Sequence, residues 1–241
     1  EARSFQSQRS KERMMMRRYT SVCLVLLFCL GVGSVPLNKH AVEADAEGKG
    51  TKCSIHMGLE TPCFQIITQA KEYEIRRYDG GQWWSTTTIP GPADWKAQTK
   101  EGFMNNFQYI GGDNTKAVKI PMSAPVLTTR KLHTGELVES FFLTKDMDPP
   151  PSPGAQAKVT LKHIVEDQAF AVITFSGWAD GDSFTAKEEE LKNLLARDGI
   201  QPWEGHHSWL AQYDPPFMPI FRRNEVWVPI NEGKIFAPRK H

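Results

Sequence analysis

The sequence predicts an α+β fold, in which a curved antiparallel sheet or distorted β-barrel is flanked by two helices. Two segments have the apolar spacing of helices, short runs rich in β-branched and aromatic residues lie around them, and the order of these elements occurs twice along the chain. Each copy reads as a hairpin, a helix and two further strands. Because neither copy could bury its sheet alone, we expect the two to join into one sheet.

The first predicted helix reads DWKAQTKEGFMNNFQYI, and Asp94 can cap its start. Its large apolar residues recur at three- and four-residue intervals, which predicts a buried stripe of Trp95, Phe103, Phe107 and Ile110, with Met104 beside them. The pair Gly111–Gly112 can end the helix in a left-handed turn.

Strands of the first copy lie on both sides of this helix. KEYEIRRYDGGQWWSTTTIPG predicts two strands joined as a hairpin around residues 79–81, where Asp-Gly-Gly favours a tight turn. After the helix, AVKIPMSAPVLTTR predicts an edge strand, because its two prolines cannot donate to a sheet. LVESFFLTKDM predicts one more strand.

The second copy repeats this plan. VTLKHIVEDQAFAVITFSGWAD predicts two strands around a polar turn at 166–168, and SWLAQYDPP and RRNEVWVPI supply the last two. We expect the polar cluster at 222–225 to form salt bridges. Between the strand pairs, DSFTAKEEELKNLLARDGI predicts a helix with a capping box of Thr185 and Glu188 and a C-terminal turn at Gly199. Its predicted buried stripe is Phe184, Leu191, Leu194 and Leu195.

The N-terminal residues predict a secreted, extracellular protein. Arg17 and Arg18 precede the apolar run 21–33, and small residues follow, which is the order of a secretory signal peptide. The run is shorter than the roughly 18–20 residues that span a bilayer, which favours a signal over an anchor. We expect four parts: upstream residues and signal peptide (1–34), an N-terminal lead-in (35–70), the folded domain (71–232) and a C-terminal tail (233–241).

Removal of the signal would leave two cysteines, Cys53 and Cys63. A single pair in an exported chain favours a disulfide, and closing this interval would contribute ~3 kcal/mol. The alternative is a metal site of Cys53, His56 and Cys63, although that spacing matches no closed zinc pattern.

Composition and motifs argue against several classes of function. Lys plus Arg number 29 and Asp plus Glu number 28, so the chain has no strong field to attract nucleic acid or a membrane surface. The sequence contains no G-x-S-x-G or H-E-x-x-H motif. We therefore predict a binding protein rather than an enzyme, with no nucleic-acid partner and no stable membrane insertion after signal cleavage. The sequence does not predict an oligomeric state.

Four ordered blocks resemble the SOUL/heme-binding-protein family. They are YEIRRY at 73–78, the strand around 84–86, FQYIGGDNTKAVKIPMSAPV at 107–126 and YDPPFMPIFRRNEVWV at 213–228. The resemblance implies a distorted β-barrel with two flanking helices, built from an internal repeat. It also implies non-covalent binding of heme or related porphyrins in a shallow apolar groove beside the first helix.

The resemblance implies candidate residues for that groove. Phe103, Met104 and Phe107 would form its flat apolar wall, Lys100 would meet a heme propionate, and Met218 would line the open side. The alternative is that the three apolar residues are simply the core stripe of the helix and that Lys100 is solvated.

One departure from the family concerns the heme iron. Some relatives carry a histidine before the second Tyr of the first block, where this chain has Arg77, so we predict heme binding without a strong axial histidine. Arg77 would pair a propionate instead. Ligation by His206 or His207 is an alternative, although neighbouring strand residues point to opposite faces. Two other functions stay open, a module that binds an apolar peptide in the same groove and a carrier of another hydrophobic small molecule.

Overall fold

The structure is a computed structural model that describes residues 51–131, 133–215, 217–218 and 221–231. The chain divides into two units, Glu1–Glu47 and Gly48–His241, and every described residue lies in the second. The predicted signal peptide, much of the lead-in and the C-terminal tail therefore lie outside the described residues. Within the described part, no helix is long and apolar enough to cross a membrane.

The described residues form two α-helices, one short 3₁₀ helix and eleven strands. The helices are α2 (Trp95–Ile110), α3 (Gly181–Arg197) and η1 (Lys145–Met147). The strands are β1 (Ile55–His56), β2 (Leu59–Glu60), β3 (Phe64–Gln69), β4 (Glu74–Tyr78), β5 (Gln82–Ile89), β6 (Val126–Arg130), β7 (Leu137–Leu143), β8 (Thr160–Ile164), β9 (Gln168–Phe175), β10 (Trp209–Gln212) and β11 (Asn224–Pro229).

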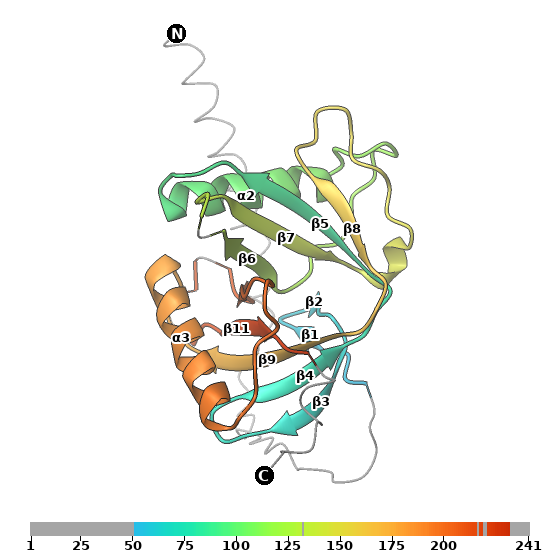
Figure 1. Ribbon diagram of the computed structural model, residues 1–241. Coiled ribbons are helices and arrows are strands. Elements are labelled where there is room, and N and C mark those ends of the chain that lie inside the picture. The colour runs from blue at the N-terminus through green and yellow to red at the C-terminus, as the bar shows by residue number, and fades with distance from the viewer. Residues whose placement is uncertain (1–50, 132, 216, 219–220, 232–241) are drawn as a thin grey trace, which may run out of the picture. The chain divides into compact units, whose positions relative to one another are not determined.

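Nine of these strands form one curled antiparallel sheet, in the order β3-β4-β9-β11-β10-β6-β7-β5-β8 (Figure 1). The predicted repeat is confirmed, because β4-β5-α2-β6-β7 is followed by β8-β9-α3-β10-β11. The equivalent strands β6 and β10 pair in the middle of the sheet, where Leu127 lies opposite Ala211. The predicted α+β fold with two flanking helices is also confirmed.

The two predicted hairpins, however, are wrong. β4 pairs with β3 and β9, whereas β5 pairs with β7 and β8. Each copy of the repeat therefore places its first strand in the other copy's half of the sheet. Residues 79–81 and 165–167 are crossover links between the halves, because strand pairing is decided by burial across the whole sheet and not by the turn sequence alone.

The two crossover links contact each other closely. The Gly81 N–H donates to the carbonyl oxygen of Ile164 at 2.7 Å, and the Gly80 N–H donates to Asp167 Oδ1 at 2.8 Å. A Cβ on residue 80 would lie 2.2 Å from the carbonyl oxygen of Val165, so only glycine fits there. The Asp-Gly-Gly sequence therefore allows the two crossover links to contact each other and does not form a hairpin turn.

The strand β6 is not the edge strand that the prolines predicted. It lies between β7 and β10 and is bonded to both. Pro121 and Pro125 precede the strand, which begins at Val126. Their missing N–H groups therefore leave the ladder intact, and the rule that confines proline to edges does not apply.

The ends of α2 follow the predicted signals. The Asp94 side chain accepts a hydrogen bond from the Ala97 N–H at 3.0 Å, which confirms the cap. The helix ends at Ile110, and of the two glycines after it, Gly112 has the positive φ of 122°.

The start of α3 differs from the prediction. The capping box consists of Asp180 and Ser183, and not of Thr185 and Glu188. The side chain of each residue accepts a hydrogen bond from the backbone N–H of the other. The Gly199 turn is confirmed by its φ of 73°. The predicted stripe is confirmed too, with Phe184, Leu191 and Leu195 buried and Leu194 packed beside them.

The sheet has a helix-covered outer face and an enclosed inner face. α3 packs on β9 and β11, and α2 packs on β5 and β7. The inner face, inside the curl, carries an aromatic cluster that includes Tyr78, Trp84, Phe142, Tyr213 and Trp227. Because successive strand residues point to opposite faces, each strand contributes to one of the helix interfaces and to the inner face.

The interface beneath α2 is more polar than predicted. The buried residues of the helix are Gln98, Gly102, Asn105, Asn106, Tyr109 and Ile110. Asn106 accepts a bond from Ser85 Oγ at 2.8 Å and donates to the carbonyl oxygen of Glu139 at 3.1 Å. The Glu139 side chain is only 2% exposed, and a Cβ on Gly102 would lie 2.9 Å from its Oε2 atom. Glycine therefore lets the helix lie close over a buried carboxyl group.

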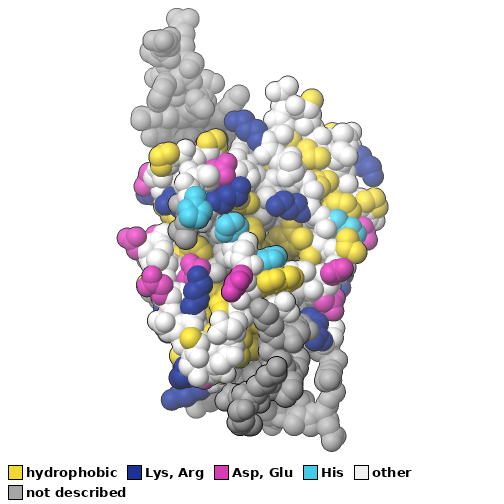
Figure 2. All heavy atoms as spheres, in the orientation of Figure 1, with side chains coloured by type: hydrophobic (Ala, Val, Ile, Leu, Met, Phe, Trp, Pro, Cys, Tyr) yellow, Lys and Arg dark blue, Asp and Glu magenta, His cyan; other side chains and the backbone are white. Residues whose placement is uncertain are grey.

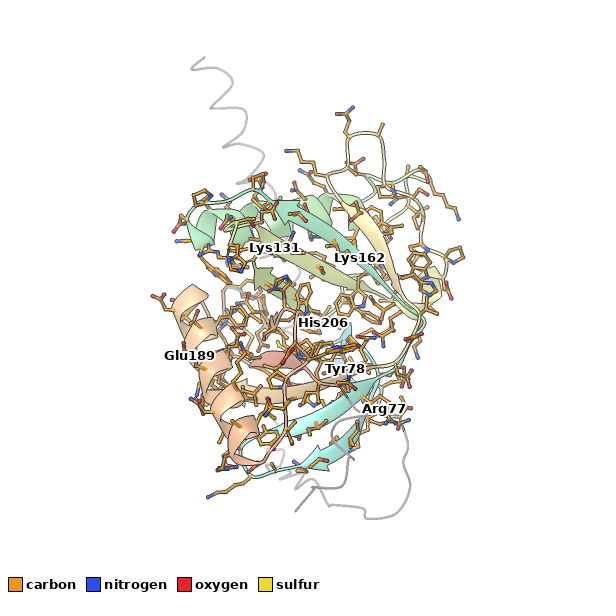
Figure 3. All side chains as sticks on the ribbon, viewed as in Figure 1. Arg77, Tyr78, Lys131, Lys162, Glu189 and His206 are labelled. Carbon is orange, nitrogen blue, oxygen red and sulfur yellow. A yellow bond between two sulfur atoms is a disulfide. The ribbon has the colours of Figure 1, made fainter. Side chains whose placement is uncertain are left out.

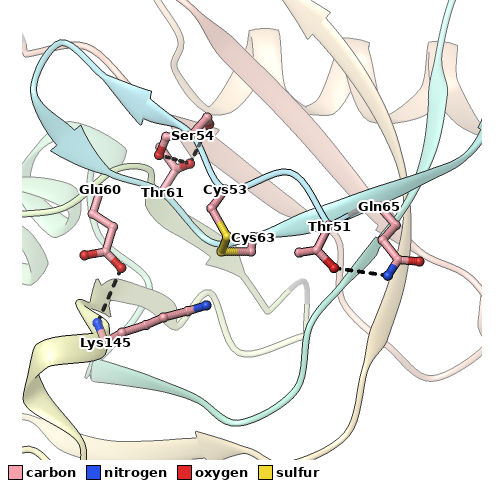
Figure 4. Close-up of a disulfide and its surroundings, with 8 residues drawn as sticks. All are labelled: Thr51, Cys53, Ser54, Glu60, Thr61, Cys63, Gln65 and Lys145. Atoms are coloured by element: carbon pink, nitrogen blue, oxygen red, sulfur yellow. Dashed lines mark hydrogen bonds between the residues drawn. A yellow bond between two sulfur atoms is a disulfide. The ribbon is translucent and has the colours of Figure 1, made fainter. Parts of the chain in front are cut away.

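A disulfide joins Cys53 and Cys63, as predicted (Figure 4). It encloses the small β1–β2 hairpin, where the hydroxyls of Ser54 and Thr61 are 2.7 Å apart. The alternative metal site is not formed, because both sulfurs are bonded to each other and His56 Nε2 lies 2.7 Å from Asp214 Oδ1. The hairpin is thereby fixed to the start of β3 and to the loop before β11.

The buried Glu139 carboxyl predicts a particular pH dependence of stability. Burial raises its pKa well above the ordinary value of 4.5. The folded state therefore holds this proton more tightly than the unfolded state, and stability is lost as the pH rises from the ordinary pKa towards the raised one. Glu139→Gln should be increasingly more stable than the wild type as the pH rises through this window, as measured by urea unfolding. Glu101→Gln, on the exposed side of α2, is the control, and parallel pH profiles for wild type and Glu139→Gln would contradict the prediction.

Candidate functional site

The curled sheet encloses a cavity of about 300 Å³. Each strand from β4 to β11 contributes to its lining, together with the loop before β10. The walls are mainly aromatic and apolar, and include Tyr78, Trp84, Leu127, Phe170, Trp209 and Trp227. Small-molecule sites have volumes of roughly 300–1,000 Å³, so the cavity is large enough to hold part or all of an organic ligand.

Three contacting rings form one wall of the cavity. The ring centroids of Tyr78 and Trp227 are 4.5 Å apart, and Phe170 lies 5.8 Å from Tyr78 and 5.6 Å from Trp227. They come from β4, β11 and β9, three neighbouring strands. Because each ring is held by the other two, the wall is a preformed surface for a flat apolar ligand.

A buried ion cluster lies under this wall. Glu225 is 0% exposed and accepts hydrogen bonds from five side chains: Arg76 Nη1 at 3.0 Å, Arg223 Nη2 at 2.6 Å, Tyr213 Oη at 2.9 Å, Trp227 Nε1 at 2.8 Å and, more weakly, Thr174 Oγ1 at 3.5 Å. The predicted salt bridge within 222–225 is therefore confirmed. Arg76 is a partner that the sequence did not identify, because it lies on a distant strand.

The electrostatics of the cluster keep Glu225 charged and Tyr78 neutral. Burial alone would raise the pKa of Glu225, but the guanidinium groups of Arg76 and Arg223 hold it below its ordinary value. Burial raises the pKa of the Tyr78 hydroxyl well above its ordinary value. That hydroxyl accepts a hydrogen bond from Arg76 Nη1 at 3.2 Å. The ion cluster therefore contacts the aromatic wall directly, through Tyr78.

The mouth of the cavity carries a cation and two histidines. Lys162 from β8 and His206 and His207 from the loop before β10 line it and are exposed. Figure 2 shows a recessed hydrophobic surface with basic and histidine side chains around it, and Figure 3 shows Lys162, Tyr78 and His206 around the gap between the two halves of the sheet. An anionic group on a ligand would meet Lys162 at this edge.

One buried amide in the cavity lacks a partner. The Gln82 side chain is on β5, and the residue is 7% exposed. Its Nε2 atom has no hydrogen-bond partner among the described residues. An unsatisfied buried donor costs about 1–3 kcal/mol, so an oxygen atom of a ligand would be favoured at this point.

Comparison with known proteins identifies the family. The model of the SOUL heme-binding protein family matches residues 59–229, which include every strand of the main sheet. The chain belongs to the SOUL heme-binding protein family. The region that the family model matches begins before the predicted domain boundary at residue 71 and includes β3.

Relatives in this family cover most of the chain. Heme-binding protein 2 of Homo sapiens is 29% identical over 180 residues, which cover 70% of this chain and 85% of that protein. Heme-binding protein 2 of Mus musculus is 28% identical over 179 residues, with the same two coverages. Heme-binding protein 1 of Xenopus tropicalis is 26% identical over 185 residues, which cover 73% of this chain and 95% of that protein.

A solved structure outside these relatives has a similar fold. The crystal structure of the EcmrR C-terminal domain aligns with a TM-score of 0.51 at 10% identity, covering 66% of this chain and 98% of that one. At this identity the likeness shows the fold alone.

The SOUL groove residues predicted on the first helix lie outside the cavity. Lys100 is exposed, and Phe103, Met104 and Phe107 are half-buried. Helical spacing places these four on one side of α2, so the structure brings them together. The rings of Phe103 and Phe107 are 5.7 Å apart, and Phe103 contacts Phe141 edge-on at 5.1 Å. The two aromatic residues therefore belong partly to the core beneath α2, and their role in a groove stays a prediction.

The other two predicted site residues are also outside the cavity. Arg77 lies between Arg76 and Tyr78 on β4, and both of these face inward, so Arg77 is on the outer face of the sheet. Met218 is half-buried in the loop after β10, where its N–H donates to the carbonyl oxygen of Pro215 at 3.1 Å. Neither residue lines the cavity that the sheet encloses.

Apart from His206 and His207, which the sequence offered as alternative iron ligands, sequence reasoning missed the residues that line the cavity. The alternation of Gln82, Trp84 and Thr86 along β5 was available as a signal for one shared face. It does not show which face is enclosed, because that depends on the exchange of strands between the two copies. The cavity is therefore a consequence of non-local pairing.

Removal of Arg76 should destabilise the SOUL domain strongly. Arg76→Met leaves the buried Glu225 with fewer compensating charges, and breaking a buried pair in this way costs roughly 3–5 kcal/mol. The free energy of unfolding from urea titration measures this loss. The loss should be smaller in the background of Glu225→Gln, since the carboxylate that needs Arg76 is then gone.

Arg77→Met is the matched control for this prediction, because it removes the neighbouring guanidinium from the opposite face of β4. Equal losses for Arg76→Met and Arg77→Met would show that the cluster around Glu225 has no special role. The wild-type contribution of Glu225 should be present above its ordinary pKa and lost as the pH falls through its lowered pKa.

Proposed function

We propose that this protein is a secreted, non-enzymatic binder of heme or a related tetrapyrrole, and that the ligand enters the cavity inside the curled sheet. The observation that supports this most is an aromatic cavity with a cation at its mouth, in a chain of the SOUL heme-binding protein family. The role would be transport or buffering of free heme.

The cavity fits the chemistry of such a ligand. A porphyrin is a flat apolar ring system with two propionates on one edge, and the wall of Tyr78, Phe170 and Trp227 offers a matching apolar face. Lys162 at the mouth would pair a propionate, and the unpartnered amide of Gln82 would donate to a ligand oxygen. Heme binding through these residues is non-covalent.

This proposal moves the ligand away from the groove predicted beside α2. The α2 side offers an exposed lysine and half-buried apolar residues, whereas the cavity offers an enclosed apolar surface, an exposed lysine and an unsatisfied buried donor. Enclosed surface contributes more to ligand binding than an open helix side, because more apolar area of the ligand leaves water. The cavity is therefore the stronger candidate.

Two exposed lysines distinguish the cavity from the α2 groove. Lys162→Glu should weaken heme binding by roughly tenfold, because a charge-assisted bond is replaced by repulsion. It should have a much smaller effect on a porphyrin that lacks propionates. Lys100→Glu makes the same charge change on α2 and should leave both affinities unchanged. Titrations followed by tryptophan quenching and Soret absorbance measure all four combinations.

The opposite result, a loss of heme affinity with Lys100→Glu and none with Lys162→Glu, would return the ligand to the α2 groove. If the wild type does not bind heme or porphyrin saturably, the proposed function is wrong. The remaining candidates are then a module that binds an apolar peptide and a carrier of a different hydrophobic molecule.

Export predicts a processed N-terminus and oxidised cysteines. When the full chain is expressed in a secreting cell, protein from the medium should begin near Val35, because residues 21–33 would be removed with the signal. It should contain no thiol that reacts with a maleimide until it is reduced, since Cys53 and Cys63 are joined. Retention of the unprocessed chain in the cell, or two reactive thiols in the native protein, would contradict the prediction.

A further inference from the structure

We infer that His206 is the axial ligand that this protein offers to heme iron, from a loop at the mouth of the cavity. The inference rests on the proposed function and adds a metal ligand to that site. It replaces the expectation, drawn from Arg77, that the chain has no strong axial histidine.

Only a histidine that lines the cavity could ligate iron there, and two of the described histidines do so. Among the histidines that the structure describes, His206 and His207 line the cavity. His163 lies between Lys162 and Ile164 on β8, which both line the cavity, so it faces outward, where it stacks on Trp83 at 4.3 Å. His56 is bonded to Asp214 at 2.7 Å.

The loop that carries His206 is fixed at both ends. Pro202 forms a β-bridge with Ile230, and the Trp203 N–H donates to the carbonyl oxygen of Pro229 at 2.8 Å, which ties its start to the end of β11. The Ser208 hydroxyl donates to Glu188 Oε1 on α3 at 2.8 Å, which ties its end. A ligand residue in this loop is therefore held in place before heme arrives.

Contacts within the loop favour His206 over His207. The His206 ring stacks on Trp203 with centroids 4.1 Å apart, and the backbone N–H of His206 donates to the carbonyl oxygen of Trp203 at 3.3 Å. Gly205 has a φ of 78°, which turns the chain just before His206. Figure 3 shows His206 at the gap between the two halves of the sheet, and Tyr78 lines the same cavity. Of the two histidines that line the cavity, His206 is therefore the one whose ring is held by an aromatic contact among the described residues.

The size of the cavity explains why a ligand at its mouth would reach the iron. A cavity of about 300 Å³ is smaller than a whole heme, so an inserted macrocycle would keep its propionate edge and part of its ring at the mouth. Lys162 and His206 both lie there. A neutral imidazole nitrogen is a common iron ligand, and its bond to the metal sets the spin state and the absorbance of the heme.

The test compares three histidine variants of the exported chain, His206→Ala, His207→Ala and His163→Ala, with two ligands, ferric heme and metal-free protoporphyrin. His206→Ala should weaken heme binding by about tenfold or more, because a bond to iron exceeds the 1.4 kcal/mol of a tenfold change. It should also shift the Soret band and change the electron paramagnetic resonance signal of the ferric complex. Binding of the metal-free porphyrin should stay within about twofold, since that ligand has no iron to coordinate.

His207→Ala and His163→Ala should keep the wild-type spectra of the heme complex, and added imidazole should restore the wild-type Soret band of His206→Ala. An unchanged heme spectrum in His206→Ala, or the same change in His207→Ala instead, would overturn the assignment while porphyrin binding still supports the proposed function. Absence of porphyrin binding in the wild type would overturn both.

Discussion

The buried carboxylate of Glu225 is the interaction on which the inner face of the sheet depends. It is bonded to arginines from β4 and the start of β11, and to Tyr213 after β10 and Trp227 further along β11. These contacts fix side chains from separate strands relative to one another around a carboxylate that is fully buried. Because one uncompensated charge at this depth would cost several kcal/mol, the positions of Arg76 and of the aromatic wall above it are linked. The cavity owes its shape to this cluster.

Strand exchange between the two copies places the cavity where neither copy alone would have one. Each half of the sheet contains the first strand of the other copy, and the crossover links meet at Gly80 with no room for a side chain. The inner faces of both halves are therefore turned towards each other, while the helices cover the outer faces. This topology supplies the space between the copies in which we propose that the ligand binds.

Features that depend on neighbouring residues could be predicted from the sequence, whereas features that depend on pairing between the two copies could not. Local signals were sufficient for both helices, the Asp94 cap, the Gly199 turn and the order of the repeat, because these depend on residues a few positions apart. The hairpins and the edge position of β6 were wrong because pairing depends on the whole sheet. The aromatic spacing of α2 predicted a buried stripe. Ile110 of that stripe is buried and its aromatic residues are half-buried, but the helix also buries amides and a glycine over Glu139. Apolar periodicity does not reveal a polar interface whose partners lie on distant strands.

Position 77 shows why a resemblance to a family motif is not enough to predict an iron ligand in this chain. In the YEIRRY block, Arg76 and Tyr78 face the cavity, so the residue between them faces the outer side of the sheet. A histidine in place of Arg77 would thus be separated from this cavity by the sheet itself. In the proposed cavity, heme iron would be ligated from the inner face or from the loops at the mouth. The loop with His206 is bonded to the residue after β11 and to α3. The arginine at position 77, where the resemblance implies a histidine in some relatives, therefore says little about iron ligation in the proposed cavity.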